Sequence, residues 1–537
     1  MIKINRKKLT NKELLNKISI ADSLYSQKKY DEALVIYNEV LDKIDKACTY
    51  EVGELYRKTG NIFYFQKKYY NALQSYETCL KYCDSNASVY LVAARLSKTS
   101  NPEKAIKYYK RGLEVGSKPA DISPFMRLLT KSHNYSQKQI KEITESLINK
   151  YRSAIFEVEK GEPFKHPKGD KNKKLHIGYL SGDFYSHAMM SFVLPILENH
   201  NKEKFDFTLF SYSPKEDSVT QRVKACGMKF VELEGLNYKG MAEKIYDEKI
   251  DILIDLTGYS RDSLFALLYK PAPIQMQYLG YLNTYGMKEV DYIWTDRFTI
   301  PENMAKYYTE KPFYIDCGMQ RFSFNNKNLI LPEITELPYK SNGFITFGSF
   351  NSISKINDYT VYLWSKLLKS IENSKLLIYR TQLNINEINA LKKEFAKNEI
   401  PVERLIFDNE PCEGLHFNSY LLADIALDPM PFNGLTITIE QAMMGVGTLT
   451  LAGENLQAKG GARVNKALGL DEFIAYTEAE YIEKAKSLVN NLERLDYYRN
   501  NLRNIVCKSE LLNDYKTFVQ CIEDGFESVW DKYCNAL

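Results

Sequence analysis

The sequence predicts an all-α helical array followed by an α/β region of two doubly wound domains. Three observations carry this prediction: a weak internal repeat in the first 115 residues, a linker rich in proline, glycine and charge, and an alternation of short apolar runs with amphipathic stretches from Leu175 onward. A chain of 537 residues is also too long for one hydrophobic core. Two such domains would face each other across a cleft, because doubly wound sheets bind ligands at the carboxyl ends of their strands.

The internal repeat is marked by Ala33, Ala72 and Ala105, which lie 39 and 33 residues apart. A small residue twelve positions earlier and a tyrosine four positions later accompany each alanine. A helix pair needs small residues where its backbones cross closely, and this period is typical of tetratricopeptide repeats. The alternative is a plain helical bundle with accidental spacing. The accompanying residues are Ala21, Gly60, Ala93, Tyr37, Tyr76 and Tyr109.

The array is expected to cover residues 1–155. Its longer first interval predicts an extended loop over residues 43–49, and residues 121–155 continue as capping helices, because a terminal repeat must present a polar face. A linker over residues 156–174 contains Gly161, Pro163 and the charge run KGDKNKK, which is typical of a domain boundary.

Two blocks of short apolar runs predict buried parallel strands. The first block holds 175–181, 207–213, 251–258 and 274–280, and the second holds 343–350, 375–380, 404–408, 423–428 and 447–453. Helices are expected between them, for example over 358–371 and 385–397. We place the first domain at 175–335, the second at 336–509 and a C-terminal helix at 510–537.

The composition narrows the class of protein. The net charge is +4, from 72 basic and 68 acidic residues, which leaves no nucleic-acid footprint. Nine cysteines without a CxxC pair fit a reducing compartment, and Cys79 and Cys83 are expected to pack rather than bind metal. The sequence shows no signal-peptide core and no apolar stretch long enough for a membrane, so we expect a cytoplasmic protein.

The segment 423–453 predicts a phosphate-binding loop. A strand ends before a loop with Asn433 and Gly434, and a helix opens at Thr436, so backbone N–H groups and the helix dipole can bind a phosphate. Thr436 and Thr438 add hydroxyl donors, and Glu440 can accept hydrogen bonds from ribose hydroxyls. The alternative is that Thr436 only caps the helix.

Three further side chains are candidates for the same chemistry. Lys355, in FGSFNSISKI, follows a strand and can pair with a diphosphate; the alternative is a solvated lysine. His187, in SGDFYSH, follows the first strand and can act as a base or a sugar-binding donor; the alternative is a structural histidine. His416 precedes the strand 423–428 and can stack on a nucleobase. The six histidines form no i, i+3 or i, i+4 pair, so we expect no metal site.

The chain from about residue 174 to 530 resembles the O-GlcNAc transferase family, including its bacterial and SPINDLY-type members. Seven collinear stretches carry the resemblance: LHIGYLSGDFYSH, DILIDLTGY, KPAPIQMQYLGYLNTYG, VDYIWTDRFTIP, FGSFNSISKI, ADIALDPMPFNGLTITIEQAMMG and GLDEFIA. The tetratricopeptide-like N-terminus is the usual companion of this family. The resemblance implies a GT-B fold, inverting transfer without a metal, and serine or threonine of proteins as acceptors.

The resemblance also implies roles for single residues. Lys355 and Thr436 match residues that contact the donor diphosphate, and His187 matches a histidine near the sugar. Glu440 matches the acidic residue on the ribose, and His416 matches the histidine beside the base.

Five positions depart from the family pattern. Leu435 stands where the family has glycine or histidine, Ile437 replaces its second threonine, and Lys459 replaces an arginine. The family's Tyr-Pro-Gly-Thr segment reads Tyr281-Leu282-Asn283-Thr284, so the chain differs from its relatives in part of the expected site.

The resemblance implies an inverting protein O-glycosyltransferase that uses UDP-GlcNAc and needs no cofactor. The general base is left open between His187, a water chain and the donor phosphate. The protein acceptor is expected to dock on the helical repeats, and bacterial relatives make flagellin the acceptor suggested by analogy. The alternatives are a transferase for GDP-fucose or UDP-glucose, and a non-catalytic partner-binding protein.

Overall fold

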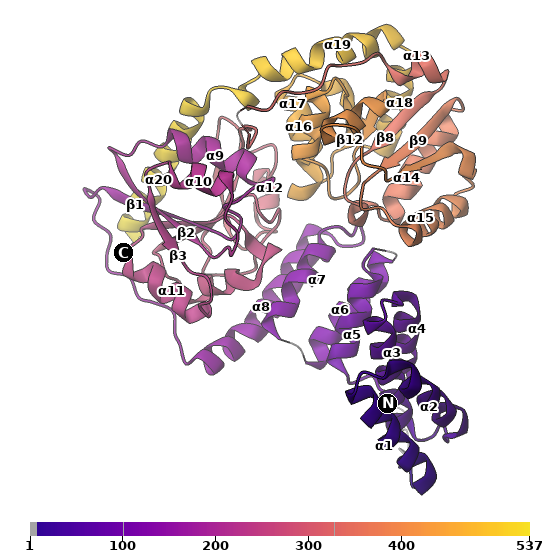
Figure 1. Cartoon of the computed structure of the whole chain (residues 1–537). Coiled ribbons are helices and arrows are strands. Elements are labelled where there is room, and N and C mark those ends of the chain that lie inside the picture. Colours follow the sequence, from indigo (N-terminus) through magenta and orange to yellow (C-terminus); the bar gives the residue numbers. More distant parts are fainter. Residues whose placement is uncertain (1–7, 100, 117, 327, 537) are drawn as a thin grey trace. The chain divides into compact units, whose positions relative to one another are not determined.

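The computed structural model describes residues 8–99, 101–116, 118–326 and 328–536. The chain divides into two compact units, Met1–Leu128 and Leu129–Leu537 (Figure 1). Within the described residues, no helix is both long enough and apolar enough to cross a membrane.

The first unit consists of helix pairs, α1 with α2, α3 with α4 and α5 with α6. The small residues predicted at the crossings are buried, and a Cβ at Gly60 would lie 2.7 Å from the ring of Tyr76. This close approach is the reason the repeat needs glycine or alanine there, and the tetratricopeptide-like array is confirmed. The helices are α1 (Lys12–Ser26), α2 (Tyr30–Lys43), α3 (Thr49–Phe65), α4 (Tyr69–Tyr82), α5 (Ala87–Ser97), α6 (Pro102–Val115) and α7 (Ile122–Leu129).

The repeat tyrosines join the two helices of a pair. Tyr37 donates a hydrogen bond from its hydroxyl to Asp22 Oδ1 at 2.6 Å, and Tyr76 donates to Asn61 Oδ1 at 2.8 Å. Both rings are at most 2% exposed, so each hydroxyl needs such a partner. The predicted extended loop is wrong: the segment between α2 and α3, residues 44–48, is short, and the longer first interval lies in α3, which has 17 residues against 11 in α5.

Helix α8 (Gln137–Glu159) belongs to the second unit, whereas the sequence placed it in the array. Its side chains bind the first sheet's loops: Arg152 Nη2 donates to Glu289 Oε2 at 2.8 Å, and Glu145 Oε1 accepts from Thr309 Oγ1 at 2.9 Å. Polar contacts with partners more than 100 residues away leave no periodic signal, which explains the misplaced boundary.

The first sheet has seven parallel strands in the order β3-β2-β1-β4-β5-β6-β7. One face is covered by α9, α10 and the C-terminal helix α20, whose apolar side chains share a core with alternate residues of β1 and β2. The strands are β1 (Leu175–Ser181), β2 (Phe205–Ser211), β3 (Lys229–Glu232), β4 (Ile252–Asp255), β5 (Ile274–Gln277), β6 (Tyr292–Thr295) and β7 (Lys311–Tyr314). The helices between them are α9 (Met190–Asn199), α10 (Ser218–Lys224), α11 (Tyr238–Asp247) and α12 (Glu302–Ala305).

The second sheet has six parallel strands in the order β10-β9-β8-β11-β12-β13. Its main core lies between the sheet and helices α14, α16, α18 and α19. The strands are β8 (Ile345–Ser349), β9 (Ser374–Tyr379), β10 (Leu405–Asp408), β11 (Ile425–Leu427), β12 (Thr448–Leu451) and β13 (Ile474–Ala475). The helices are α13 (Pro338–Asn342), α14 (Asp358–Ser370), α15 (Ile385–Lys397), α16 (Thr436–Met443), α17 (Gly460–Ala467), α18 (Glu478–Val489) and α19 (Leu492–Lys508).

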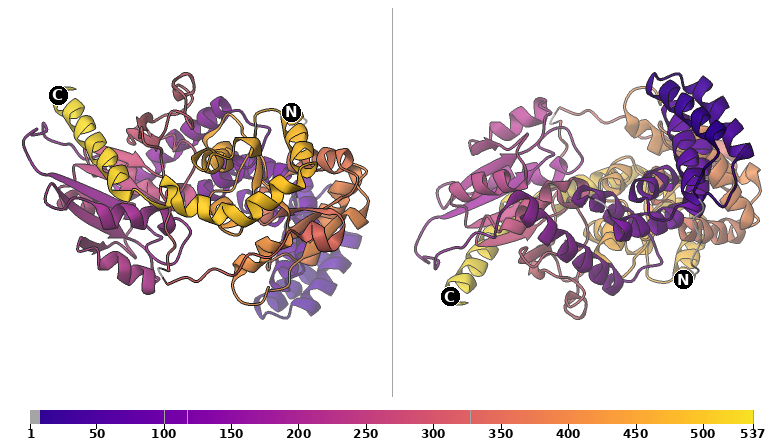
Figure 2. Two further views of the ribbon diagram at one scale, coloured as in Figure 1. Left: turned by 90° about the horizontal axis from the view of Figure 1, so that it is seen from above. Right: turned by 90° about the horizontal axis from the view of Figure 1, so that it is seen from below.

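The chain returns to the first sheet at its end. Helix α19 packs against α16 of the second domain, and α20 (Tyr515–Ala536) packs against α9 of the first. Figure 2, seen from above, shows these two helices in yellow running from one sheet to the other. Trp530 Nε1 fixes the last helix by donating to the carbonyl of Asp170 at 2.9 Å. The two domains are therefore joined by a second crossing of the chain as well as by the segment before β8.

The predicted strands are present, but β3, β6, β7 and β13 were missed. Length alone does not explain this, because β4, β5 and β11 are equally short and were predicted. β3 and β7 are edge strands whose residues are mostly not buried, so they lack the continuous apolar run of a central strand, and β13 has only two residues.

We expect a chain starting at Leu129 to keep the melting temperature of the second unit, and one starting at Gly161 to lose much of it. Removing α8 takes away Arg152, the ion-pair partner of Glu289, and also the buried side chains Ile140, Ile148 and Ile155, each worth about 1.5–3 kcal/mol of apolar burial. Thermal unfolding of the two truncated proteins measures this. Equal melting temperatures would show that α8 is not part of the second unit.

Candidate functional site

The site residues lie where the strand order of each sheet reverses, between β1 and β4 and between β8 and β11. At such a switch point the loops leave in opposite directions and open a crevice at the carboxyl edge. Lys355 follows β8, the loop 428–435 follows β11, and His187 follows β1. The sequence therefore folds each candidate loop onto the edge where ligands bind.

Lys355 lies against the loop after β11. Its Nζ donates to the carbonyl of Asn433 at 2.9 Å and to Asn351 Oδ1 at 3.2 Å, and it lies 4.8 Å from the ring centroid of Phe432. Burial lowers the pKa of Lys355 to about 8, and the nearby Asp428 opposes this shift. An ammonium carries three N–H donors, so one donor remains for a ligand beyond these two acceptors.

The carboxylate of Asp428 anchors the loop 428–435. It is 1% exposed, and its Oδ1 accepts from the backbone N–H of Gly434 at 2.5 Å while its Oδ2 accepts from Thr450 Oγ1 at 3.0 Å. Burial raises the pKa of Asp428 to about 7, against these hydrogen bonds and the charge of Lys355. A Cβ at Gly434 would lie 2.6 Å from the side chain of Ile437, so only glycine fits at this turn.

Helix α16 begins at Thr436, and its N-cap position is Leu435, which offers no side-chain acceptor. Thr436 therefore does not cap the helix, and the first-turn N–H groups face the loop without a side-chain cap. Thr436 is partly exposed, whereas Thr438 is 1% exposed and lies beneath Gly434. The hydroxyl at Thr436 is the one placed to reach a ligand.

Glu440 and His416 lie together at the end of this loop region. Glu440 Oε2 accepts from the hydroxyl of Tyr420 at 2.6 Å and lies 3.4 Å from His416 Nε2. The side chain of His416 is 61% exposed and that of Glu440 is 16% exposed. The exposed imidazole ring can stack on a planar ligand, and the held carboxylate can accept hydrogen bonds from hydroxyl groups.

His187 comes from the other sheet and stands apart from this group. It is exposed, and its Nδ1 accepts from the backbone N–H of Met189 at 3.3 Å, which leaves Nε2 for a ligand. Among the described residues, no hydrogen bond or ion pair joins His187 to the candidates of the second sheet. The second-sheet candidates therefore form one cluster, and His187 belongs to another.

Two residues near these clusters were not singled out in the sequence. Asp183 follows β1, is 5% exposed, and accepts from Thr257 Oγ1 and Arg261 Nη2, each at 3.4 Å. Arg380 follows β9, donates to the carbonyl of Phe350 at 3.1 Å, and lowers the pKa of Lys355 by its charge. Their positions at the ends of the motifs SGDFYSH and KLLIYR were the available signal.

Comparison with known proteins identifies the family of this chain. The profile described as Glycosyl transferase family 41 matches residues 132–337 and 327–522. The chain belongs to glycosyl transferase family 41.

Two curated relatives of this family 41 chain come from plants. A "Probable UDP-N-acetylglucosamine--peptide N-acetylglucosaminyltransferase SPINDLY" of Hordeum vulgare is 31% identical over 374 residues, which cover 68% of this chain and 39% of that protein. The protein of the same name from Arabidopsis thaliana is 29% identical over 379 residues, covering 68% and 40%. The chain spans about two fifths of the length of the curated relatives it matches.

A solved structure matches the whole fold. A mutant O-GlcNAc transferase of Thermobaculum terrenum superposes with a TM-score of 0.77 at 23% identity, covering 98% of this chain and 100% of that one. This likeness confirms the predicted architecture, an α/β region of GT-B type behind an all-α array.

The departures from the family 41 pattern lie mostly in the interior. Leu435 packs against the main core of the second domain, and Ile437 packs against the smaller cluster on the other face. Lys459 donates from Nζ to the carbonyls of Phe298 and Thr299, at 2.9 and 3.2 Å, and so joins the two domains. These side chains support the loop rather than line it.

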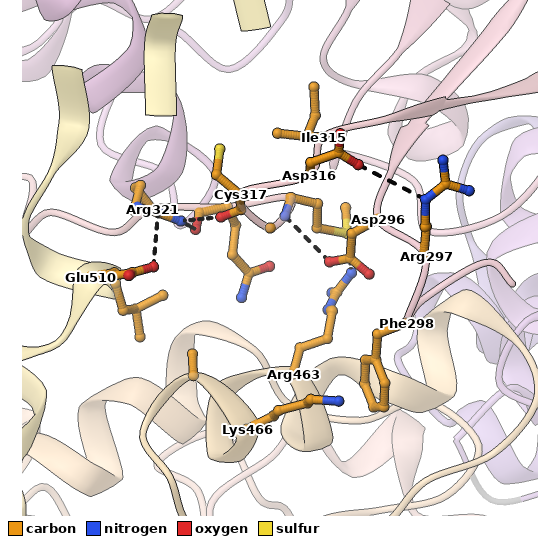
Figure 3. Close-up of a pocket in the computed structure, with 15 residues that line it drawn as sticks. Asp296, Arg297, Phe298, Ile315, Asp316, Cys317, Arg321, Arg463, Lys466 and Glu510 are labelled. Atoms are coloured by element: carbon orange, nitrogen blue, oxygen red, sulfur yellow. Dashed lines mark hydrogen bonds and ion pairs between the residues drawn. The ribbon is translucent and has the colours of Figure 1, made fainter. Parts of the chain in front are cut away.

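Two cavities of the second unit lie away from the candidate residues. A cavity of about 350 Å³ lies at the ends of β6 and β7, where Figure 3 shows Arg463 of α17 pointing toward Asp296. A second of about 740 Å³ is lined by residues such as Tyr359 and Glu478. Neither is lined by a predicted site residue. No group of three or more His, Cys, Asp or Glu suited to a metal occurs among the residues described.

The loop after β5 is held by a buried carboxyl group. Glu310 is 2% exposed and accepts from Thr284 Oγ1 and from the backbone N–H of Tyr285, both at 2.7 Å. Burial raises the pKa of Glu310 to about 7, above its ordinary value of 4.5. A group whose pKa is raised in the folded state stabilises it at low pH, and this stability is lost as the pH rises through the folded pKa.

We therefore expect Glu310→Gln to weaken the fall in melting temperature between about pH 4 and about pH 8, because ionising this carboxyl in the folded state costs on the order of 3 kcal/mol. Thermal unfolding at both pH values measures this, with the exposed Glu302→Gln as control. An unchanged pH dependence in Glu310→Gln would contradict the raised pKa.

Proposed function

We propose that this chain is an inverting, metal-independent protein O-glycosyltransferase that moves GlcNAc from UDP-GlcNAc to serine or threonine. The observation that carries the proposal is the ammonium of Lys355 held at the carbonyl of Asn433, beside the first turn of α16. Membership of family 41 and the printed names of the plant relatives support the reaction class and the donor.

The chemistry of the leaving group follows from this arrangement. When the bond from the anomeric carbon to the diphosphate breaks, negative charge grows on the diphosphate oxygens. Lys355, the N–H groups at the start of α16 and the hydroxyl of Thr436 are placed to stabilise that charge, with Arg380 as a further cation nearby. The backbone of Asn433 and Gly434 forms the wall of the phosphate site. A fixed set of donors needs no bridging metal.

The nucleoside is proposed to lie over Glu440 and His416. The carboxylate of Glu440 accepts hydrogen bonds from the ribose hydroxyls, and the exposed ring of His416 stacks on the base. Thr438 was expected to bind the donor directly; its buried position gives it the role of supporting Gly434.

The acceptor hydroxyl attacks from the face opposite the diphosphate, and the first domain supplies that face. His187, with Nε2 available, stands ready to accept the proton or to bind the sugar. Asp183 is a second carboxylate of the same loop, held by Thr257 and Arg261. The protein acceptor is proposed to dock on the helical array, and flagellin is the first protein to test.

Two rival functions are distinguished by direct measurement. A transferase for GDP-fucose or UDP-glucose would be stabilised more strongly against heat by that nucleotide sugar than by UDP-GlcNAc. A non-catalytic binding protein would release no nucleotide from any of the three. Intact mass spectrometry of flagellin co-expressed with this chain tests the proposal, because the mass gain reports the sugar and the acceptor together.

We expect Lys355→Ala to lower turnover at least about a hundredfold, the ~3 kcal/mol effect of losing one charge-stabilising donor. Nucleotide release from the donor measures it. Lys366→Ala, which removes a lysine with 43% side-chain exposure and an ion pair to Glu478, is the control and should change turnover little. More than half the activity remaining in Lys355→Ala would refute the assignment.

We expect full activity in excess EDTA. We also expect Glu440→Ala to raise the donor KM more than it lowers kcat, because ribose contacts are the same in the ground state and the transition state. Initial rates with and without chelator, and donor saturation curves, measure these effects. Activity lost in EDTA and restored by Mg²⁺ or Mn²⁺ would contradict the metal-independent mechanism.

A further inference from the structure

Three buried amide side chains meet at one point of the second unit. Gln137 of α8, Asn283 of the loop after β5 and Gln457 of the helical turn η7 (Leu456–Lys459) are each at most 2% exposed. We call these three side chains the amide junction. They come from segments 146 and 174 residues apart in the chain.

The hydrogen bonds of the amide junction are reciprocal. Gln137 Nε2 donates to Asn283 Oδ1 at 2.8 Å, and Asn283 Nδ2 donates back to Gln137 Oε1 at 3.0 Å. Asn283 Nδ2 also donates to Gln457 Oε1 at 3.1 Å, and Gln457 Nε2 donates to the carbonyl of Thr130 at 3.3 Å. Each amide is satisfied, and such a network fixes a single arrangement.

A backbone hydrogen bond connects the amide junction to the loop 428–435, which we call the phosphate loop. The carbonyl of Gln457 accepts from the backbone N–H of Asn433 at 3.0 Å, and the carbonyl of Asn433 accepts from Lys355 Nζ at 2.9 Å. Both peptide groups that flank the Cα of Asn433 are thereby held, one by η7 and one by the lysine. A shift of Gln457 must move the acceptor of Lys355.

A second path reaches the same lysine from the segment before α8. Lys131 Nζ donates to Ser354 Oγ at 2.7 Å, and the carbonyl of Lys131 accepts from Asn357 Nδ2 at 2.8 Å. Asn357 Nδ2 also donates to the carbonyl of Met430 at 2.9 Å. Residues 130–137 therefore contact both sides of the turn that carries Lys355.

We propose that Asn283 and Gln457 are positioning residues for Lys355, and that the segment 130–137 sets the phosphate loop through them. The inference rests on the proposed role of Lys355. This linkage makes the donor site depend on the segment that directly follows the helical array.

The test is the kinetics of Gln457→Met, a volume-conserving change that removes the amide. The donor is whichever of UDP-GlcNAc, UDP-glucose and GDP-fucose the wild type uses fastest. We expect kcat/KM to fall about tenfold, donor KM to rise, and the alkaline limb of the pH profile, set by Lys355, to move to higher pH, since a loosened ammonium is better solvated.

Gln275→Met is the matched control. Gln275 is fully buried and donates to the carbonyls of Leu267 and Glu289, at 3.0 and 2.7 Å, without contact to the amide junction. A loss of folded protein alone lowers apparent kcat and leaves KM and the pH limb in place. Should Gln457→Met not yield folded protein, Asn283→Ala carries the same test, because it leaves the backbone of Gln457 unchanged.

The double variant Asn283→Ala with Gln457→Met tests whether the two residues act together. If they do, its kcat/KM should be no lower than that of whichever single variant is less active. KM and pH limb equal to those of Gln275→Met, or additive effects in the double variant, would overturn the inference. If Lys355→Ala itself retains activity, the proposed function fails; if Lys355→Ala is inactive and Gln457→Met behaves as the control, only this inference fails.

Discussion

The partly buried ammonium of Lys355 is the charge around which the loop after β11 is arranged. A buried ammonium is costly unless it is paired, and its one nearby carboxyl, Asp428, is itself held by Gly434 and Thr450. The pKa of the lysine is lowered to about 8 and that of the aspartate is raised to about 7, so both groups resist ionisation. A bound diphosphate would add negative charge beside the ammonium and raise its pKa. The site is thus prepared for an anionic ligand.

The same constraint explains the small residues around the loop. A Cβ at Gly460 would lie 2.5 Å from the carbonyl of Gly434, and a Cβ at Gly461 would meet the carboxyl of Asp428. The carbonyl of Gly434 and the carboxyl of Asp428 therefore lie directly against the backbone at the start of α17. Rigid backbone donors near the lysine can stabilise charge without rearrangement, which is the property a leaving-group site requires.

Much of this could be predicted from the sequence because its signals are local. The strand 175–181 and the helix 385–397 agree with β1 and α15 at both ends, since each has a strong apolar pattern and clear boundaries. Lys355 and Thr436 could be placed at the carboxyl edge of the second sheet, and Glu440 one turn further along α16, because they come after predicted strands; their roles stay predictions. The roles of Asp428 and Gln457 could not be predicted, because they depend on partners brought together by tertiary packing, and the outer strands β3 and β7 are too exposed to leave a continuous apolar run.

The departures at Leu435 and Ile437 alter how the second domain can bind a phosphate. Both side chains are apolar and pack inward, so hydroxyl donors are concentrated at Thr436, and Thr438 is covered by Gly434. With fewer side-chain donors, the charge of Lys355 and the uncapped N–H groups of α16 carry more of the interaction. The position of that charge then matters more than in a site rich in hydroxyls. The buried hydrogen bonds that run from α8 through η7 to the carbonyl of Asn433, which accepts from Lys355, fix the position of that charge.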